Sequence, residues 1–121
     1  MKKILITGGS GFIGTNFINY LSKSKIKIVN IDKISKVSTP EKFKQILNKK
    51  NYFFIKYNLN DYKKIFNILK KEKPDFIINF AAESHVDRSI SDPLYFIKNN
   101  IDSSINLFLA YARYQKLKKT V

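Results

Sequence analysis

Short apolar runs alternate with amphipathic segments along the 121 residues of this chain. The runs are rich in β-branched and aromatic residues, and their length is typical of strands. Their nearly continuous apolar character indicates strands buried in a parallel sheet. Four strands are therefore predicted, at residues 3–7, 26–31, 52–57 and 76–80.

The segments between the strands show helical periodicity. The first predicted helix follows the glycine-rich residues 8–14, and its apolar residues are Phe17, Ile18 and Leu21. The second begins at Pro40, with Thr39 as its cap, and runs toward Lys50.

Two further helices are predicted in the second half of the chain. Asp61 caps the third, which ends before Pro74 and whose apolar side comprises Ile65, Phe66, Ile68 and Leu69. Asp92-Pro93 opens the last. Its predicted buried stripe comprises Ile97, Ile101, Ile105, Phe108 and Ala112.

This alternation of strands and helices favours an α/β fold. Right-handed crossovers would arrange the strands as a parallel sheet in the order 3-2-1-4, part of a Rossmann doubly wound sheet. We expect residues 1–121 to form one domain that is incomplete at its C-terminus.

All four glycines of the chain lie in one loop between the first strand and the first helix. Gly9, Gly11 and Gly14 match G-x-G-x-x-G, and Gly8 gives the variant G-x-x-G-x-x-G. Glycines here permit a tight turn and the approach of a diphosphate, and the helix N-terminus attracts its negative charge. Such a pattern is weak alone, but here it follows a strand and precedes a helix.

Asp32 follows the second strand, 18 residues after Gly14. A dinucleotide-binding unit places an acid there to bind the adenosine ribose hydroxyls. A carboxylate at this point would repel a 2′-phosphate, which favours NAD over NADP. An aspartate in an ordinary turn is the alternative, and the glycine loop favours the cofactor.

Composition narrows the function classes. The chain has no cysteine, which excludes disulfides and thiolate metal sites. No metal site is expected, no apolar run is long enough for a membrane span, and we expect a cytoplasmic protein. The net charge of +14 comes almost entirely from scattered lysines. Specific nucleic-acid recognition is therefore not expected, because it favours arginine.

Ala81–Ile90, with the sequence AAESHVDRSI, directly follows the fourth strand. In open α/β sheets, ligands bind outside the carboxyl ends of the strands. This position favours a ligand-binding segment, although the pattern also fits a solvated loop before a helix.

Together with the glycine loop and Asp32-Lys33, this segment resembles the dTDP-glucose 4,6-dehydratase family of extended short-chain dehydrogenases/reductases. The resemblance covers nearly the whole chain but only the N-terminal portion of such an enzyme. It implies that NAD is the cofactor and that dTDP-glucose is the substrate, once the missing half completes the site. The cofactor contacts it implies are Gly8, Gly11, Phe12, Ile13, Gly14, Asp32, Lys33, Ile34, Ser35, Asn58, Leu59, Phe80, Ala81, Ala82, Glu83, Ser84 and Asn99, with Ser84 also meeting the sugar nucleotide.

Three departures from the family pattern fall in this set. Asn58 and Asn99 stand where aspartate and threonine are usual, and Ile34–Ser38 replaces Leu-Thr-Tyr-Ala-Gly. Adenine recognition is therefore expected to be looser than in the family.

The resemblance assigns no catalytic residue to this chain. The family's Tyr-x-x-x-Lys motif and Asp-Glu pair correspond to positions beyond residue 121. Two Tyr-x-x-x-Lys matches occur here, Tyr52–Lys56 and Tyr114–Lys118, and we reject both. One lies within a strand, and the other lies far from the carboxyl edge of the sheet.

Several interpretations stay open. The chain could be an inactive NAD-binding portion, one chain of a split enzyme, a portion of an enzyme for another nucleotide sugar, or a non-catalytic basic binding module. Within residues 1–121 alone, the fourth strand would lack a neighbour on one side. An exposed apolar edge favours pairing with another chain.

Overall fold

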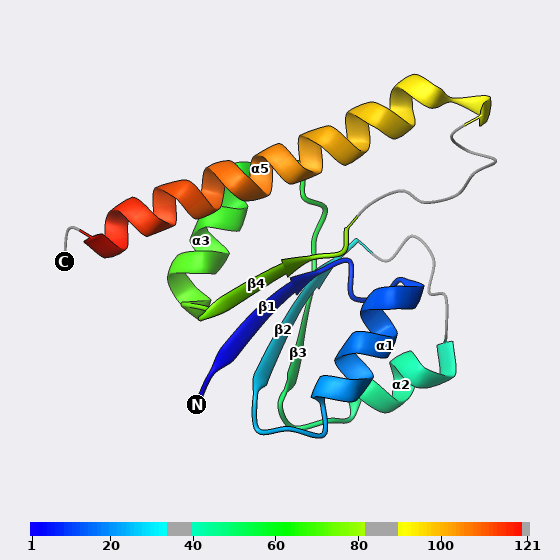
Figure 1. Ribbon diagram of the computed structural model, residues 1–121, viewed down its shortest axis with the longest axis vertical. Coiled ribbons are helices and arrows are strands. Elements are labelled where there is room, and N and C mark those ends of the chain that lie inside the picture. The colour runs from blue at the N-terminus through cyan, green and yellow to red at the C-terminus, as the bar shows by residue number, and fades with distance from the viewer. Residues whose placement is uncertain (34–39, 82–89, 120–121) are drawn as a thin grey trace. The chain divides into compact units, whose positions relative to one another are not determined.

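The computed structural model describes residues 1–33, 40–81 and 90–119 (Figure 1). The chain divides into two compact units. The first comprises Met1–Asn58 and Lys73–Ala81, and the second comprises Leu59–Glu72 and Ala82–Val121.

The first unit contains a four-stranded parallel sheet in the order β3-β2-β1-β4, which confirms the predicted topology. Its strands are β1 (Lys3–Thr7), β2 (Lys27–Asp32), β3 (Tyr52–Lys56) and β4 (Phe76–Asn79). Because all strands run the same way, their carboxyl ends share one edge of the sheet. The predicted functional segments follow those ends.

The core of the first unit lies between the sheet and two helices, α1 (Phe12–Leu21) and α2 (Pro40–Leu47), which cover the same face (Figure 1). Its fully or nearly fully buried members are Ile4, Ile6, Ile18, Ile28, Ile46 and Tyr52. Burying each aliphatic side chain contributes about 1.5–3 kcal/mol to the free energy of folding. This packing stabilises the carboxyl edge of the sheet, where the glycine loop begins.

The fourth strand differs from its prediction. The apolar run 76–80 predicts a buried strand, but Phe76 is 54% exposed and Asn79 is also exposed. Among the described residues, β4 pairs with β1 alone. The prediction of an edge strand is therefore confirmed, and the prediction of burial is wrong for Phe76 and Asn79, the two ends of a strand that has no described neighbouring strand on its other edge.

Two helices form the described part of the second unit, α3 (Tyr62–Glu72) and α5 (Pro93–Lys119). The Lys63 N–H donates to Asp61 Oδ1 at 2.9 Å, which confirms the predicted cap. The buried residues of α3 are Ile65, Phe66 and Leu69, three of its four predicted apolar positions.

The buried face of α5 is not the predicted one. Ile97, Ile101, Ile105, Phe108 and Ala112 are all exposed, and the buried residues are Leu107, Ala110 and Tyr114. The helix carries apolar residues on more than one face, and periodicity alone does not identify the one that packs. The predicted opening is confirmed, since the Tyr95 N–H donates to Asp92 Oδ1 at 3.2 Å.

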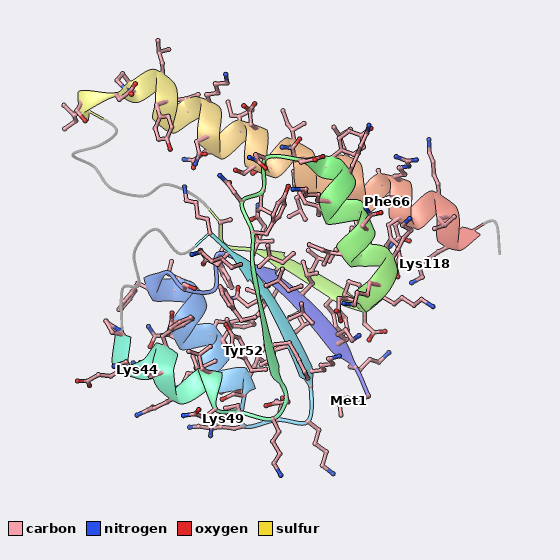
Figure 2. The ribbon with its side chains drawn as sticks, turned by 180° about the vertical axis from the view of Figure 1, so that it is seen from behind. Met1, Lys44, Lys49, Tyr52, Phe66 and Lys118 are labelled. Carbon is pink, nitrogen blue, oxygen red and sulfur yellow. The ribbon has the colours of Figure 1, made fainter. Side chains whose placement is uncertain are left out.

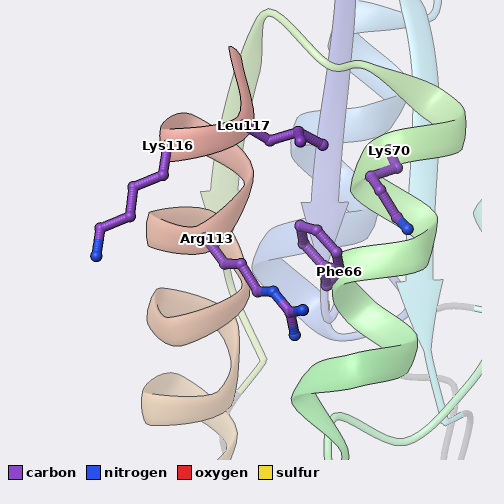
Figure 3. Close-up of a pocket in the computed structure, with 5 residues that line it drawn as sticks. All are labelled: Phe66, Lys70, Arg113, Lys116 and Leu117. Carbon is purple, nitrogen blue, oxygen red and sulfur yellow. The ribbon is translucent and has the colours of Figure 1, made fainter. Parts of the chain in front are cut away.

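The C-terminal halves of α3 and α5 border an open groove (Figure 3). Arg113 and Lys70 lie on either side of the Phe66 ring, each with its cationic group 4.6 Å from the ring centroid. The Arg113–Phe66 contact joins α5 to α3, whereas the Lys70–Phe66 contact lies within α3.

Element boundaries differ slightly from the predictions. The second helix ends at Leu47 rather than near Lys50, and β3 and β4 each end one residue early. No helix in the described ranges is long and apolar enough to cross a membrane. The cytoplasmic location stays a prediction.

Candidate functional site

The glycine loop connects β1 to α1 at the carboxyl edge of the sheet. Gly8 has φ +71°, a backbone conformation that residues other than glycine rarely adopt. A Cβ atom at Gly8 would lie 2.5 Å from the Ala81 backbone nitrogen. The loop therefore needs glycine where it passes the chain leaving β4.

The N-terminus of α1 has no capping side chain. Gly11 occupies its N-cap position, so no side chain caps the first turn. Phe12 and Ile13 follow and are 66% and 67% exposed. The first backbone N–H groups of a helix have no intrahelical acceptor, and they bind anions well. Gly14 is buried within the first turn, where it permits close packing against the loop.

Ser10 links this loop to the end of β2. Its backbone N–H donates to Asp32 Oδ2 at 2.8 Å. Its side chain is buried, and its Oγ has no hydrogen-bond partner among the described residues. A buried hydroxyl beside an uncapped helix start fits a site for a phosphate-containing cofactor, because a bound oxygen would satisfy it.

Asp32 is the last residue of β2 and is half-buried, at the point where the sequence predicts the ribose-binding acid. Its backbone carbonyl accepts from the Tyr57 N–H at 3.0 Å, so the chain leaving β3 toward Asn58 runs beside it. Lys33 follows and is half-buried. The next predicted contacts, Ile34 and Ser35, lie outside the described residues.

Two buried side chains, Asn30 and Tyr52, support the glycine loop through hydrogen bonds. The Gly9 N–H donates to Asn30 Oδ1, and Asn30 Nδ2 donates to the Tyr52 hydroxyl oxygen, each at 2.9 Å. Burial is the main cause that raises the pKa of Tyr52 to about 12, and the nearby Asp32 charge raises it further. The hydrogen bond from Asn30 opposes both effects. Tyr52 is therefore neutral at ordinary pH.

The chain leaving β4 is fixed to β1. Asn79 Oδ1 accepts a short hydrogen bond from the Thr7 hydroxyl and another, at 3.1 Å, from the Ala81 N–H. The Phe80 N–H donates to the Thr7 carbonyl at 2.8 Å. Phe80 and Ala81 thus start the predicted ligand segment directly beside Gly8. Its other predicted contacts, Ala82, Glu83 and Ser84, lie outside the described residues.

Two of the predicted contacts within the described ranges belong to the second unit. Leu59 is buried, and its carbonyl accepts from Asn106 Nδ2 at 3.1 Å. Asn99 is half-buried in α5, where its carbonyl accepts from the Ser103 hydroxyl at 2.7 Å. Their part in a cofactor site stays a prediction, as does the role of every other predicted contact.

The two Tyr-x-x-x-Lys matches have structural explanations. The Tyr52 hydroxyl accepts a hydrogen bond from Asn30. Tyr114 is buried, and Lys118 Nζ lies 5.5 Å from its ring centroid, an i, i+4 contact along α5. Within the described ranges, no three His, Cys, Asp or Glu side chains gather closely enough to hold a metal ion.

Sequence reasoning missed Ser10, Asn30 and Asn79. Ser10 stands within the glycine motif, where any small residue satisfies the pattern. Asn30 and Asn79 are each a single polar residue within the apolar run of a strand, β2 and β4 respectively. That pattern was the available signal for them.

Comparison with known proteins agrees with this geometry. A family model described as GDP-mannose 4,6 dehydratase matches residues 5–121. The dTDP-glucose 4,6-dehydratase of Haemophilus influenzae is 40% identical over 108 residues, which are 88% of this chain and 32% of that protein. The chain thus spans about a third of the length of the curated relatives it matches.

Solved structures show the same arrangement. The UDP-Glc/GlcNAc 4-epimerase of Campylobacter jejuni is 28% identical, with a TM-score of 0.84 over 95% of this chain and 35% of that one. The dTDP-glucose 4,6-dehydratase of Bacillus anthracis, in complex with NAD, is 29% identical, with a TM-score of 0.78 over 94% and 34%. The chain therefore belongs to the epimerase and dehydratase family of the extended short-chain dehydrogenases/reductases, which includes the dTDP-glucose 4,6-dehydratases, and it corresponds to the N-terminal portion of its members.

Proposed function

We propose that this chain is the NAD-binding portion of an enzyme that converts dTDP-glucose to dTDP-4-keto-6-deoxyglucose. The observation that carries the proposal is the Ser10–Asp32 hydrogen bond, which joins the glycine loop to the ribose-binding position at 2.8 Å. The 40% identity to a dTDP-glucose 4,6-dehydratase supports the choice of sugar nucleotide.

The residues of this chain bind and orient the cofactor. The uncapped first turn of α1, with Gly11, Phe12 and Ile13, receives the diphosphate through backbone N–H groups. Asp32 accepts hydrogen bonds from the ribose hydroxyls and repels a 2′-phosphate, so NAD is preferred to NADP. When bound, NAD supplies the hydride acceptor that the redox cycle of such an enzyme requires.

The proposed activity needs groups that lie outside residues 1–121. The proton-transfer residues of the family correspond to positions beyond residue 121, and the two local Tyr-x-x-x-Lys matches have structural roles. We therefore propose that residues 1–121 bind NAD but do not turn over dTDP-glucose. The part that corresponds to the remaining two thirds of the relatives would complete the site.

Thermal unfolding with and without NAD tests the proposal. A ligand at one hundred times its Kd stabilises the folded state by about 2.7 kcal/mol, and the melting temperature should rise accordingly. NADP should give a smaller rise, and Asp32→Ala should remove the difference between the two cofactors. No shift with NAD at millimolar concentration would contradict cofactor binding. Turnover of dTDP-glucose by this chain alone would contradict the division of roles.

A further inference from the structure

The Asn30 side chain is a fully buried polar group in the middle of an apolar core. It lies in the central strand β2 between Val29 and Ile31, both of which are also buried. Both ends of its amide are used, since the oxygen accepts from Gly9 and the nitrogen donates to Tyr52. A buried amide costs free energy unless it is hydrogen-bonded, so each of these partners is needed.

The chemistry of the partners fixes the orientation of this amide. The Gly9 backbone N–H can only donate, so the Asn30 oxygen must face it. The Asn30 nitrogen then faces Tyr52, whose hydroxyl oxygen accepts. With the amide turned over, two N–H donors would face each other at Gly9. The Gly9 N–H therefore fixes the orientation of the Asn30 amide, and the Tyr52 hydroxyl accepts from the nitrogen that this orientation turns toward it.

Gly9 is held from a second side as well. Its carbonyl accepts from the Thr15 hydroxyl of α1 at 3.0 Å. The residue between Gly8 and Ser10 is thus attached to β2 through its N–H and to α1 through its carbonyl. Tyr52, labelled in Figure 2, extends the support to β3. It is only 6% exposed.

We propose that Asn30 and Tyr52 are positioning residues that hold the glycine loop in the conformation that receives the diphosphate of the cofactor. This inference rests on the proposed function. Neither residue is accessible to a ligand, because Asn30 is fully buried and Tyr52 is nearly so. They act by fixing the direction of the Gly9 peptide before the ligand arrives, which lowers the ordering cost of binding.

A set of three ligands separates this role from a general effect on the fold. Tyr52→Phe removes the acceptor for Asn30 and preserves the ring in the core. Its Kd for NAD and for ADP should rise about five- to tenfold, the equivalent of one hydrogen bond. Its Kd for adenosine, which carries no phosphate, should stay unchanged. Asn30→Leu should have a larger effect of the same kind, and Tyr20→Phe, at an exposed tyrosine of α1, is the matched control.

Amide hydrogen exchange at Gly9 gives a second readout that needs no ligand. Exchange should be slow in the wild-type protein and about tenfold faster in Tyr52→Phe, with no change in Tyr20→Phe. Unchanged affinity for NAD and ADP in Tyr52→Phe would overturn the inference, and so would an equal loss of affinity for adenosine. If the wild-type protein itself binds neither NAD nor ADP, the proposed function fails first, and Gly9 exchange alone then reports whether the pair holds the loop.

Discussion

Gly8 and Gly11 lie in the same loop under different constraints. Gly8 has a positive φ, and a Cβ there would meet the backbone of the chain leaving β4. Gly11 has φ −72° and ψ 176°, which any residue adopts, and its nearest neighbour to an added Cβ is the Gly8 carbonyl at 3.5 Å. The fold therefore requires glycine at position 8. At position 11, only the approach of the proposed cofactor would require it.

Alanine at each position separates the two requirements. Gly8→Ala should lower the free energy of unfolding by about 2 kcal/mol or more, through backbone strain and collision. Gly11→Ala should change it by only about 1 kcal/mol, the scale of an N-cap change. The same Gly11→Ala change should raise the Kd for NAD about tenfold or more, because the Cβ blocks the approach of the diphosphate. Urea unfolding and calorimetric titration measure the two effects, and normal NAD affinity in Gly11→Ala would argue against this loop as the diphosphate site.

Tyr52 also makes stability depend on pH. Its pKa is raised from 10.0 to about 12 in the folded protein, chiefly by burial and also by Asp32, against the opposing effect of the Asn30 hydrogen bond. Below pH 10 the hydroxyl is neutral in both states, and its contribution is fully present. Between pH 10 and about 12 the unfolded chain loses this proton first, so the folded state is progressively disfavoured.

The free energy of unfolding should accordingly fall by about 2 kcal/mol across that interval. Because high pH also affects the rest of the protein, the quantity to measure is the difference in the free energy of unfolding between the wild-type protein and Tyr52→Phe. Urea unfolding at several pH values from 9 to 12 should show the two curves converging as pH rises. Parallel curves would mean that Tyr52 ionises as easily in the folded state as in the unfolded state.

At the level of elements, local signals predict the first unit well. Apolar runs flanked by glycine and proline predict the strands, and right-handed crossovers predict their order. Asp61 and Asp92 are visible as helix caps because capping depends on nearby residues only. The glycine loop and Asp32 are predictable for the same reason, since their spacing reflects one connected β-α-β unit.

What the sequence does not predict depends on contacts between distant residues. Asn30 stands within an apolar strand, and nothing in its immediate neighbours shows that it holds Gly9, 21 residues earlier. The face of α5 is a similar case. Ile101 and Ile105 form as good an apolar stripe as Leu107 and Ala110, and only the packing of α3 distinguishes them.

Truncation to alanine tests which face of α5 stabilises the second unit. Leu107 is 2% exposed, so Leu107→Ala should lower the free energy of unfolding by about 2–4 kcal/mol. Ile105 is 47% exposed, and Ile105→Ala should change it by about 0.5 kcal/mol or less. Urea unfolding of both variants gives the comparison. A larger loss at Ile105 would mean that the predicted stripe, and not the observed one, is buried.

At the scale of the whole molecule, two properties oppose each other. A net charge of +14 makes copies of the chain repel one another at low ionic strength. The edge of β4 has the opposite tendency, because within the described ranges this strand pairs with β1 alone and carries the exposed Phe76, and an apolar edge strand favours pairing with another chain. Salt shortens the range of the repulsion and leaves the edge unchanged. Association through this edge should therefore increase with salt.

Sedimentation velocity at two salt concentrations tests this expectation. Raising NaCl from about 0.05 M to about 0.5 M reduces the Debye length from about 14 Å to about 4 Å, and the wild-type protein should then shift toward dimers or larger species. Phe76→Lys places a charge on the edge strand, a device that natural sheets use against pairing, and it should stay monomeric at both concentrations. Tyr20→Lys adds the same charge to an exposed position of α1 and should associate as the wild-type protein does. If both variants stay monomeric, net charge rather than the β4 edge controls association.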